Sequence, residues 1–259
     1  MFDIHTHILP NIDDGSSSVD ESLSMLRELY SQGVGLAVAT PHFYPDENSP
    51  ERFMRKRREA WEKLIPLLEA DMPKIRLGAE VKWYDGIDRK EAISRFCIEG
   101  TDLLLVEMPF YRWTDRMIQS LFELKRKYGI TVVLAHIERY VTYQPHCIWK
   151  RLALNGILLQ VSAGAFDSFL SRRRYLKMLS EGTVTFIGTD CHNMHTRRPN
   201  MAQAEKIIAR HLGSDFLEGL YKKEAEWLNE SEKTAYFGAD SIARGGIGSY
   251  HGGKASQKA

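Results

Sequence analysis

The sequence contains little cysteine, and its cysteines are not spaced for cross-linking or for thiolate metal sites. Three of the 259 residues are cysteines, at positions 97, 147 and 191, and no two of them form a C-x-x-C motif. A small and odd number of cysteines argues against a disulfide framework and against a cysteine-rich zinc site. Such a chain suits a reducing compartment, so we predict a cytoplasmic protein.

Long apolar runs and a net charge are missing as well. No apolar run approaches the roughly 20 residues that a membrane-spanning helix requires, and a polar stretch follows the first four residues, MFDI. We therefore expect neither membrane insertion nor a signal peptide. The 35 basic and 34 acidic residues leave a formal net charge of +1. No overall field draws the chain to nucleic acid, so we expect no nucleic-acid partner.

What the sequence does contain is a series of short apolar segments separated by longer amphipathic ones. The short segments are rich in Val, Ile and Leu on both faces, which is typical of strands buried in a parallel sheet. The predicted strands are residues 2–4, 36–39, 75–78, 103–106, 131–134, 158–161 and 184–188.

Helices are predicted between these strands. In the first, Val19, Leu23, Leu26 and Tyr30 share one face, and Gly33 ends it. The other predicted helices are residues 51–69, 114–128, 166–180 and 201–212, and residues 213–235 are expected to be helical and to pack on the outside.

Seven successive β-then-α units favour a single parallel α/β barrel, and an open doubly wound sheet is the alternative. We assign residues 1–238 to this domain. Residues 239–259 are rich in Gly, Ser and Ala, and we predict that they form a disordered tail.

Residues that can bind metal follow six of the seven predicted strands. The carboxyl ends of the strands in a parallel barrel meet at one face, so these side chains are expected to converge there. They are His5, His7, Asp14, His42, Glu80, Glu107, His136, Asp190 and His192. Five imidazoles and four carboxylates are too many ligands for one ion. Without thiolate, they suit zinc, manganese or iron.

Each of these residues also has a simpler interpretation. A single histidine at a strand end is often a hydrogen-bonded core residue, and a single glutamate can pair with an arginine. A buried carboxylate without compensation is costly, however. The repetition of the pattern along the chain therefore favours a metal site.

Two arginines follow the candidate ligands closely. Arg139 lies three residues after His136, and Arg197 lies five residues after His192, next to Arg198. The planar guanidinium group suits a phosphate dianion, whereas the alternative for each arginine is a structural ion pair. Two such residues beside metal ligands favour an anionic substrate.

Cys191 and Arg197 also fit C-x5-R, the loop of cysteine-dependent phosphatases. That loop cradles phosphate with backbone N–H groups and usually contains glycine, but the intervening residues here are HNMHT. Because two candidate ligands also flank Cys191, we do not expect it to be a nucleophile.

Seven segments together resemble the PHP (polymerase and histidinol phosphatase) superfamily. They are MFDIHTHILPNIDDGS, ATPHF, GAEV, VEMPF, AHIERY, QVSAGA and GTDCHNMHTRRPNM, and they span residues 1 to about 201. The best match is to the CpsB/CapC-type tyrosine phosphatases of bacterial capsule and exopolysaccharide operons. Two departures are Lys82-Trp83, where the family is rich in tyrosine, and Arg198, where proline is common.

The resemblance implies a distorted seven-stranded (β/α) barrel with a trinuclear metal site. By position, one ion would be held by His5, His7, Glu80 and Asp190. Glu80 would bridge to a second ion held by Glu107 and His136, and the third would be held by Asp14, His42 and His192. Arg139 and Arg197 match positions that bind the substrate phosphate.

The expected function is therefore metal-assisted hydrolysis of phosphotyrosine, with about three divalent ions. Manganese is the expected metal, and zinc or iron are alternatives. The resemblance implies a bacterial tyrosine kinase of polysaccharide synthesis as the protein partner, and a homo-oligomer is possible. The alternatives are a histidinol-phosphate-type phosphatase of small molecules and a non-catalytic module that binds such a kinase.

Overall fold

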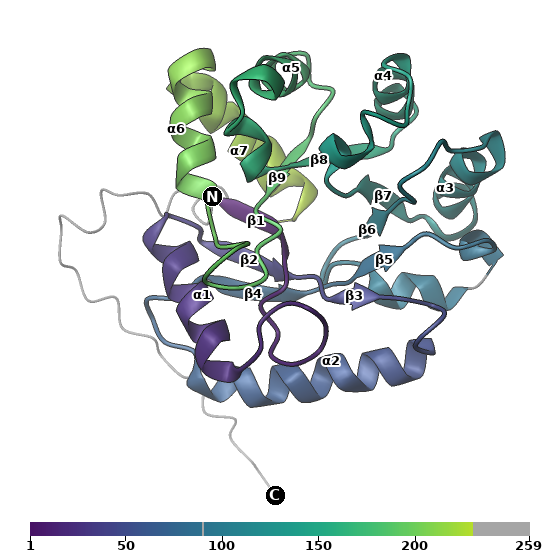
Figure 1. Ribbon diagram of the computed structural model, residues 1–259. Helices are drawn as coiled ribbons and strands as arrows, with labels where there is room; N and C mark the ends of the chain where they lie inside the picture. Colours follow the sequence, from purple (N-terminus) through teal and green to yellow (C-terminus); the bar gives the residue numbers. More distant parts are fainter. Residues whose placement is uncertain (90, 230–259) are drawn as a thin grey trace, which may run out of the picture.

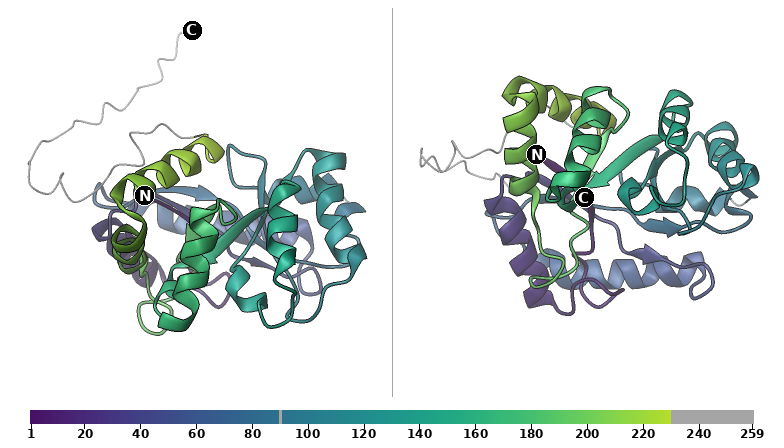
Figure 2. Two further views of the ribbon diagram at one scale, coloured as in Figure 1. Left: turned by 90° about the horizontal axis from the view of Figure 1, so that it is seen from above. Right: turned by 45° about the horizontal axis from the view of Figure 1, so that its top comes forward.

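The strands form a curled parallel sheet with helices packed around its outside (Figure 1, Figure 2). The structure is a computed structural model and describes residues 1–89 and 91–229. The strands are β1 Phe2–Thr6, β2 Leu36–Ala39, β3 His42–Phe43, β4 Lys74–Leu77, β5 Glu80–Lys82, β6 Leu103–Glu107, β7 Thr131–Leu134, β8 Leu158–Ser162 and β9 Phe186–Gly188. They pair in the orders β1-β2-β4 and β3-β5-β6-β7-β8-β9, and each pair is parallel. The prediction of a parallel α/β fold is confirmed.

Short breaks within two strands connect the two sets. β2 continues into β3 after Thr40 and Pro41, and β4 continues into β5 after Gly78 and Ala79. The backbone N–H of Gly78 donates to Ala39 O at 2.8 Å, so the paired strands stay in contact across the breaks. At the other edge, β1 meets the segment after β9, where Asp190 N–H donates to His5 O at 2.8 Å.

Seven α-helices lie in the described residues. They are α1 Val19–Ser31, α2 Pro50–Leu64, α3 Asp115–Tyr128, α4 Cys147–Leu154, α5 Phe169–Ser180, α6 Met201–Leu212 and α7 Ser214–Trp227. Short 3-10 turns add η1 Ile65–Leu67, η2 Ile87–Arg89, η3 Glu91–Phe96, η4 Ile137–Tyr140 and η5 Ala163–Phe166. Ser18, Ser49 and Thr114 accept hydrogen bonds from backbone N–H groups in the first turns of α1, α2 and α3.

The predicted helices are all present, with three differences in extent. α2 ends at Leu64, short of residue 69; α5 begins at Phe169, because residues 163–166 form a 3-10 turn; and α7 ends at Trp227. The proposed domain end at residue 238 and the tail 239–259 lie outside the described residues. No helix of the described part of the chain is long and apolar enough to cross a membrane.

The expectation of seven regular β-then-α units is wrong in one place. Between β5 and β6 the described residues contain the 3-10 turns η2 and η3 and no α-helix. In addition, α4, which lies between β7 and β8, was not predicted from the sequence.

Apolar side chains pack on both faces of the curled sheet. The larger cluster joins the outer face to the helices. Alternate strand residues face the other way and form what we call the inner apolar cluster. Its members are Phe2, Ile4, Leu36, Val38, Ile98, Leu103, Leu105, Val133, Ala135, Leu158, Phe186, Ala225 and Leu228. Because Ala225 and Leu228 belong to α7 and the residue just after it, this segment closes the inner cluster at one end.

Candidate metal centre

Local irregularities in β1 and β9 bring His5 and His7 to the carboxyl end of the sheet. The register of β1 against β2 shifts between Asp3 and Thr6. A bulge of this kind re-aims the side chains that follow it. On β9, a Cβ atom at Gly188 would lie 2.8 Å from the Cβ of His5, so a glycine is needed for the two strands to pass.

The neighbouring strands supply further ligand candidates at the same level. His42 of β3 and Glu80 of β5 are register partners, and Glu107 ends β6. His136 follows β7 and Asp190 follows β9, with φ angles of 29° and 54°. Such angles are unfavourable for residues other than glycine, and they concentrate at functional sites.

Glu80 is the centre of the cluster. Its Oε2 atom lies 3.2 Å from His5 Nε2, 3.4 Å from His7 Nε2 and 2.9 Å from His42 Nδ1. Its Oε1 atom lies 2.7 Å from His136 Nε2, which is itself 3.5 Å from Glu107 Oε1. One buried carboxylate therefore touches four imidazole rings.

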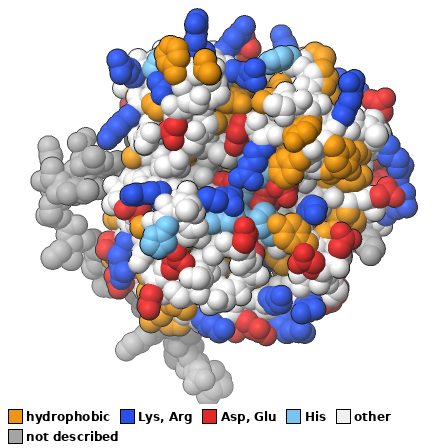
Figure 3. Space-filling model, viewed as in Figure 1, with side chains coloured by type: hydrophobic (Ala, Val, Ile, Leu, Met, Phe, Trp, Pro, Cys, Tyr) orange, Lys and Arg blue, Asp and Glu red, His pale blue; other side chains and the backbone are white. Residues whose placement is uncertain are grey.

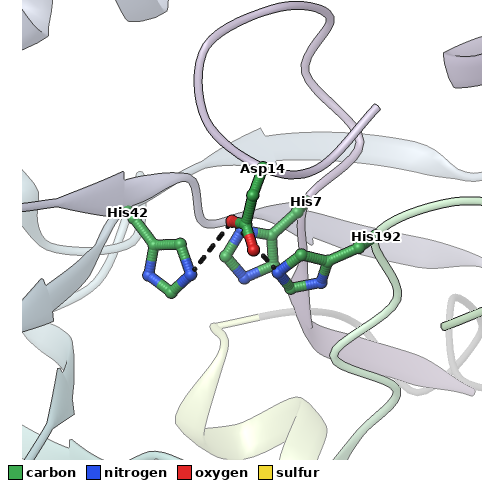
Figure 4. A group of neighbouring side chains, drawn as sticks. All are labelled: His7, Asp14, His42 and His192. Carbon is green, nitrogen blue, oxygen red and sulfur yellow. Dashed lines mark ion pairs between the residues drawn. The ribbon is translucent and has the colours of Figure 1, made fainter. Parts of the chain in front are cut away.

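Asp14 gathers a second part of the cluster (Figure 4). Its Oδ1 atom lies 3.4 Å from His42 Nε2 and 3.5 Å from His192 Nε2, and the three side chains point toward one another beside His7. Ligand atoms of His7, Asp14, His42 and His192 all lie within 4.8 Å of one another.

Two further groups meet the same criterion. They are His5, His7 and Asp190, and His42, Glu80 and Glu107. With His136 held against Glu80, the structure brings all nine predicted residues into one cluster.

The chemistry of this cluster fits divalent cations. All donors are imidazole nitrogens or carboxylate oxygens. Three buried atoms, Glu80 Oε2, Asp190 Oδ1 and His192 Nε2, have no hydrogen-bond partner among the described residues, and all three face the cluster. Unpaired buried polar atoms are costly, and cations among them would remove that cost.

The pKa directions show opposite charges stabilising one another at Glu80, Asp190 and His7, whereas burial, with His7 and Arg197, lowers the pKa of His192 to about 3. Burial alone would raise the pKa of Glu80 and Asp190, but His5 and the other imidazoles hold the Glu80 pKa well below its usual range and lower that of Asp190 to about 2. Burial would lower the pKa of His7, but Asp13 and Glu80 outweigh it and raise the value to about 10. A site that attracts a proton this strongly also attracts a metal ion, which would replace that proton.

Two supporting residues were not found from the sequence. Asp13 Oδ2 accepts hydrogen bonds from His7 Nδ1 at 2.7 Å and from the backbone N–H of His42 at 2.9 Å. Gln160 Oε1 accepts from His5 Nδ1 at 3.3 Å and from the backbone N–H of His136 at 2.6 Å. The contacts to Nδ1 leave Nε2 of His5 and His7 free as a ligand.

Arg139 and Arg197 lie beside the cluster and share one partner. Arg139, on η4, and Arg197, after His192, both donate to Asp190 Oδ2, in the case of Arg197 at 2.6 Å. Each is 35% exposed and lines a cleft of about 1300 Å³. Arg198 lines the same cleft, is 60% exposed and lies 3.7 Å from Glu28. Figure 3 shows basic, acidic and histidine side chains together in the hollow at the centre of this face.

Cys191 has an environment unlike that of a nucleophile. Its side chain is fully buried in the larger apolar cluster. Burial, with a contribution from Asp3, raises the pKa of its thiol well above the usual range. The thiolate that a cysteine phosphatase requires is therefore disfavoured here, in agreement with the sequence argument.

The chain matches one known protein family over most of its length. The family model "Capsular polysaccharide synthesis, CpsB/CapC" matches residues 1–229. Tyrosine-protein phosphatase CpsB of Streptococcus agalactiae is 30% identical over 245 residues, which are 87% of this chain and 97% of that protein. Tyrosine-protein phosphatase YwqE of Bacillus subtilis is 28% identical, over 83% of this chain and 86% of YwqE.

The fold has a solved counterpart. A chain from the crystal structures of YwqE from Bacillus subtilis and CpsB from Streptococcus pneumoniae, described as unique metal-dependent tyrosine phosphatases, superposes with a TM-score of 0.76. It is 24% identical, and the match covers 89% of this chain and 96% of that one. At this identity the likeness establishes the fold.

Proposed function

The chain belongs to the CpsB/CapC family of capsular polysaccharide synthesis, and on that premise we propose that it is a metal-dependent tyrosine-protein phosphatase. The observation that carries the proposal is the gathering of five histidines and four carboxylates around Glu80, with two arginines against Asp190. Imidazole and carboxylate ligands suit ions that activate water, and guanidinium groups suit a phosphate dianion.

The donor set is large enough for about three divalent ions. In this proposal His5, His7, Glu80 and Asp190 would hold one ion, and Glu107 and His136, with Glu80, would hold a second. Asp14, His42 and His192 hold the third, which agrees with the approach of both imidazoles to Asp14 Oδ1. Manganese is the proposed metal, with zinc or iron as alternatives, since imidazole and carboxylate donors without thiolate suit all three.

The proposal includes a seven-stranded barrel of the PHP type. β2 with β3, and β4 with β5, each count as one strand interrupted by two residues, which reduces nine strands to seven. The backbone hydrogen bonds between β1 and the segment after β9 support closure of the ring.

The protein residues have separate tasks in the reaction. The nine ligand candidates would hold divalent ions, whose chemistry there would be to lower the pKa of water and to withdraw charge from the phosphoryl group. Arg139 and Arg197 donate hydrogen bonds to the phosphoryl oxygens, where negative charge is concentrated. Asp190 orients both arginines through Oδ2. The leaving phenoxide has a pKa of about 10 and needs less protonation than an alkoxide would.

Hydrolysis of an aryl phosphate tests the proposal directly. Protein stripped with chelator should be inactive, and added manganese or another divalent ion should restore turnover. Full activity in metal-free protein would contradict the metal mechanism, and absence of hydrolysis with every divalent ion would favour a non-catalytic kinase-binding module.

A comparison of substrates separates this function from a histidinol-phosphate phosphatase. We expect a higher kcat/KM for a phosphotyrosine peptide than for histidinol phosphate. We further propose that this protein is cytoplasmic and that its substrate is a bacterial tyrosine kinase of polysaccharide synthesis, which loss of phosphotyrosine from such a kinase would test.

A further inference from the structure

An exposed aromatic loop borders the metal centre on the side of β6 and β7. After Glu107 the chain presents Phe110 and Tyr111, which are 45% and 53% exposed. The ring of Phe110 is nearly parallel to those of His136 and Tyr140, with centroids 6.5 and 5.5 Å away. Figure 3 shows hydrophobic side chains directly beside the histidines of the central hollow.

This loop is fixed from beneath by hydrogen bonds at both ends. The backbone N–H of Met108 donates to Tyr140 Oη at 3.0 Å, and Trp113 Nε1–H donates to Pro109 O at 2.9 Å. Gln144, which is buried, donates to Tyr111 O at 2.7 Å and accepts from the backbone N–H of Trp113 at 3.3 Å. These hydrogen bonds fix the backbone on both sides of Phe110, whose side chain is half-exposed.

Exposed phenylalanines need no functional explanation in general. Phe169, at the start of α5, is 73% exposed and has no described ring contact. Phe110 differs because its loop, fixed by hydrogen bonds, places it against a buried tyrosine and a histidine of the candidate metal centre, which are themselves neighbours. Part of its apolar surface remains open to water, and a ligand that covered this surface would gain free energy.

We propose that Phe110 forms an aryl-binding subsite, which receives the aromatic ring of the substrate while its phosphate lies against Arg139 and Arg197. The turn η4 links the two parts, because it carries both Arg139 and Tyr140, the residue that supports Phe110. Aromatic rings prefer the offset-stacked or edge-to-face packing that such a wall offers. This inference rests on the proposed phosphatase function and makes it specific for aryl rather than alkyl phosphates.

The test compares phenyl phosphate with glycerol phosphate in wild type, Phe110→Ala and Phe169→Ala, each with manganese. We expect Phe110→Ala to lower kcat/KM for phenyl phosphate about three- to tenfold, mainly through KM, and to change that for glycerol phosphate less than twofold. Phe169→Ala, a substitution of the same exposed residue type away from the cluster, should leave both values unchanged. Phe110→Tyr should retain the wild-type ratio.

Equal losses on both substrates, or no loss on either, would overturn the subsite. Failure of the phosphatase function has a different signature, since the wild type would then hydrolyse neither compound. In that case calorimetric binding of phenylphosphonate and methylphosphonate decides. A preference for the phenyl compound that Phe110→Ala removes would support the subsite without catalysis, and equal binding would refute it.

Discussion

The inner face of the curled sheet has an apolar half and a polar half. The same strands contribute apolar side chains to the first and histidines and carboxylates to the second. On β6, Leu103 and Leu105 belong to the inner apolar cluster, whereas Glu107, on the same face two residues later, belongs to the candidate metal centre. On β2 and β3, Val38 and His42 show the same change. Both halves are buried, so burial alone does not distinguish a stabilising region from a functional one.

The two halves differ in how their burial affects stability. The apolar half gains roughly 25 cal/mol for each Å² removed from water. The polar half buries Glu80 and Asp190 with one oxygen each that has no hydrogen-bond partner among the described residues. A structure retains such groups where function needs them, and here a bound cation would convert the cost into affinity.

The largest effect should come from removing the centre of the polar half. Glu80→Ala should lower bound metal by more than one equivalent, because this carboxylate touches histidines from both sides of the cluster. We expect aryl phosphate hydrolysis to fall about a thousandfold, equivalent to ~4 kcal/mol of barrier. Metal analysis and steady-state kinetics measure the two quantities.

Ile4→Val, in the apolar half, is the matched control. It should reduce stability by about 0.5–1.5 kcal/mol and leave metal content and kcat intact. A normal metal content in Glu80→Ala would show that the shared-ligand assignment is wrong.

A smaller loss should follow when the phosphate contacts are removed and the metal ligands remain. Arg197→Ala should bind a full complement of metal but lose kcat/KM and sensitivity to inhibition by phosphate. Because Arg197 is 35% exposed, we expect the lower end of the range for losing one partner of a charge pair, about 2 kcal/mol. Arg198→Ala is the control, since its exposed side chain faces Glu28. If Arg197→Ala had the same kcat/KM as Arg198→Ala, Arg197 would be a surface residue without a role in phosphate binding.

The strands of the apolar half are easier to predict from the sequence than those of the polar half. Buried parallel strands are continuous apolar runs, so β2 and β7 lie at the predicted residues. β3 and β5 were missed because they are only two and three residues long and begin with the polar His42 and Glu80. α4 follows His146, whose side chain makes no capping hydrogen bond, so its start carries no sequence signal.

Within the site, the topology made the strand-end donors predictable, but it did not distinguish neighbouring residues of the same type. Asp13 and Asp14 are adjacent in the sequence. In the fold the Asp14 side chain is 64% exposed to solvent, and its Oδ1 faces His42 and His192. Asp13 instead contacts Nδ1 of His7, on the side of the ring away from Glu80. Only the path of the loop separates a ligand candidate from its support. A Cβ atom at Gly15 would lie 2.4 Å from His7 O, which restricts that path.

Asp13→Asn tests the supporting role. A neutral amide accepts a weaker hydrogen bond from His7 Nδ1, so the affinity for metal should fall about 10- to 100-fold. Saturating manganese should restore most of the turnover, because the ligands themselves remain. Asp20→Asn, on an exposed position of α1, is the matched control. If saturating metal fails to restore activity, Asp13 has a more direct role than support.

The smallest effect on activity should come from a carboxylate buried on the apolar side. Glu224, on α7, is 1% exposed, and its Oε1 accepts from the backbone N–H of Ile187 at 3.3 Å. Burial raises its pKa from 4.5 to about 8, with Ile187 N–H and the amino group of Met1 opposing the rise, and Asp3 and Glu205 adding to it. Between these two values the folded chain keeps a proton that the unfolded chain has released. Stability therefore decreases as pH rises through this window.

Glu224→Gln should remove that dependence, because the amide has a similar shape and does not titrate between pH 4.5 and 8. We expect the variant and the wild type to unfold at similar temperatures at pH 5. At pH 8.5 the variant should unfold a few degrees higher. The contribution of the metal-ligand candidates to pH dependence cancels when the two proteins are compared at each pH. Aryl phosphate hydrolysis should be unchanged at both values.

A difference in unfolding temperature that is the same at pH 5 and pH 8.5 would mean that Glu224 does not titrate in this window. The apolar half would then contain a permanently charged carboxylate, and the contrast between the halves would be weaker than their composition suggests.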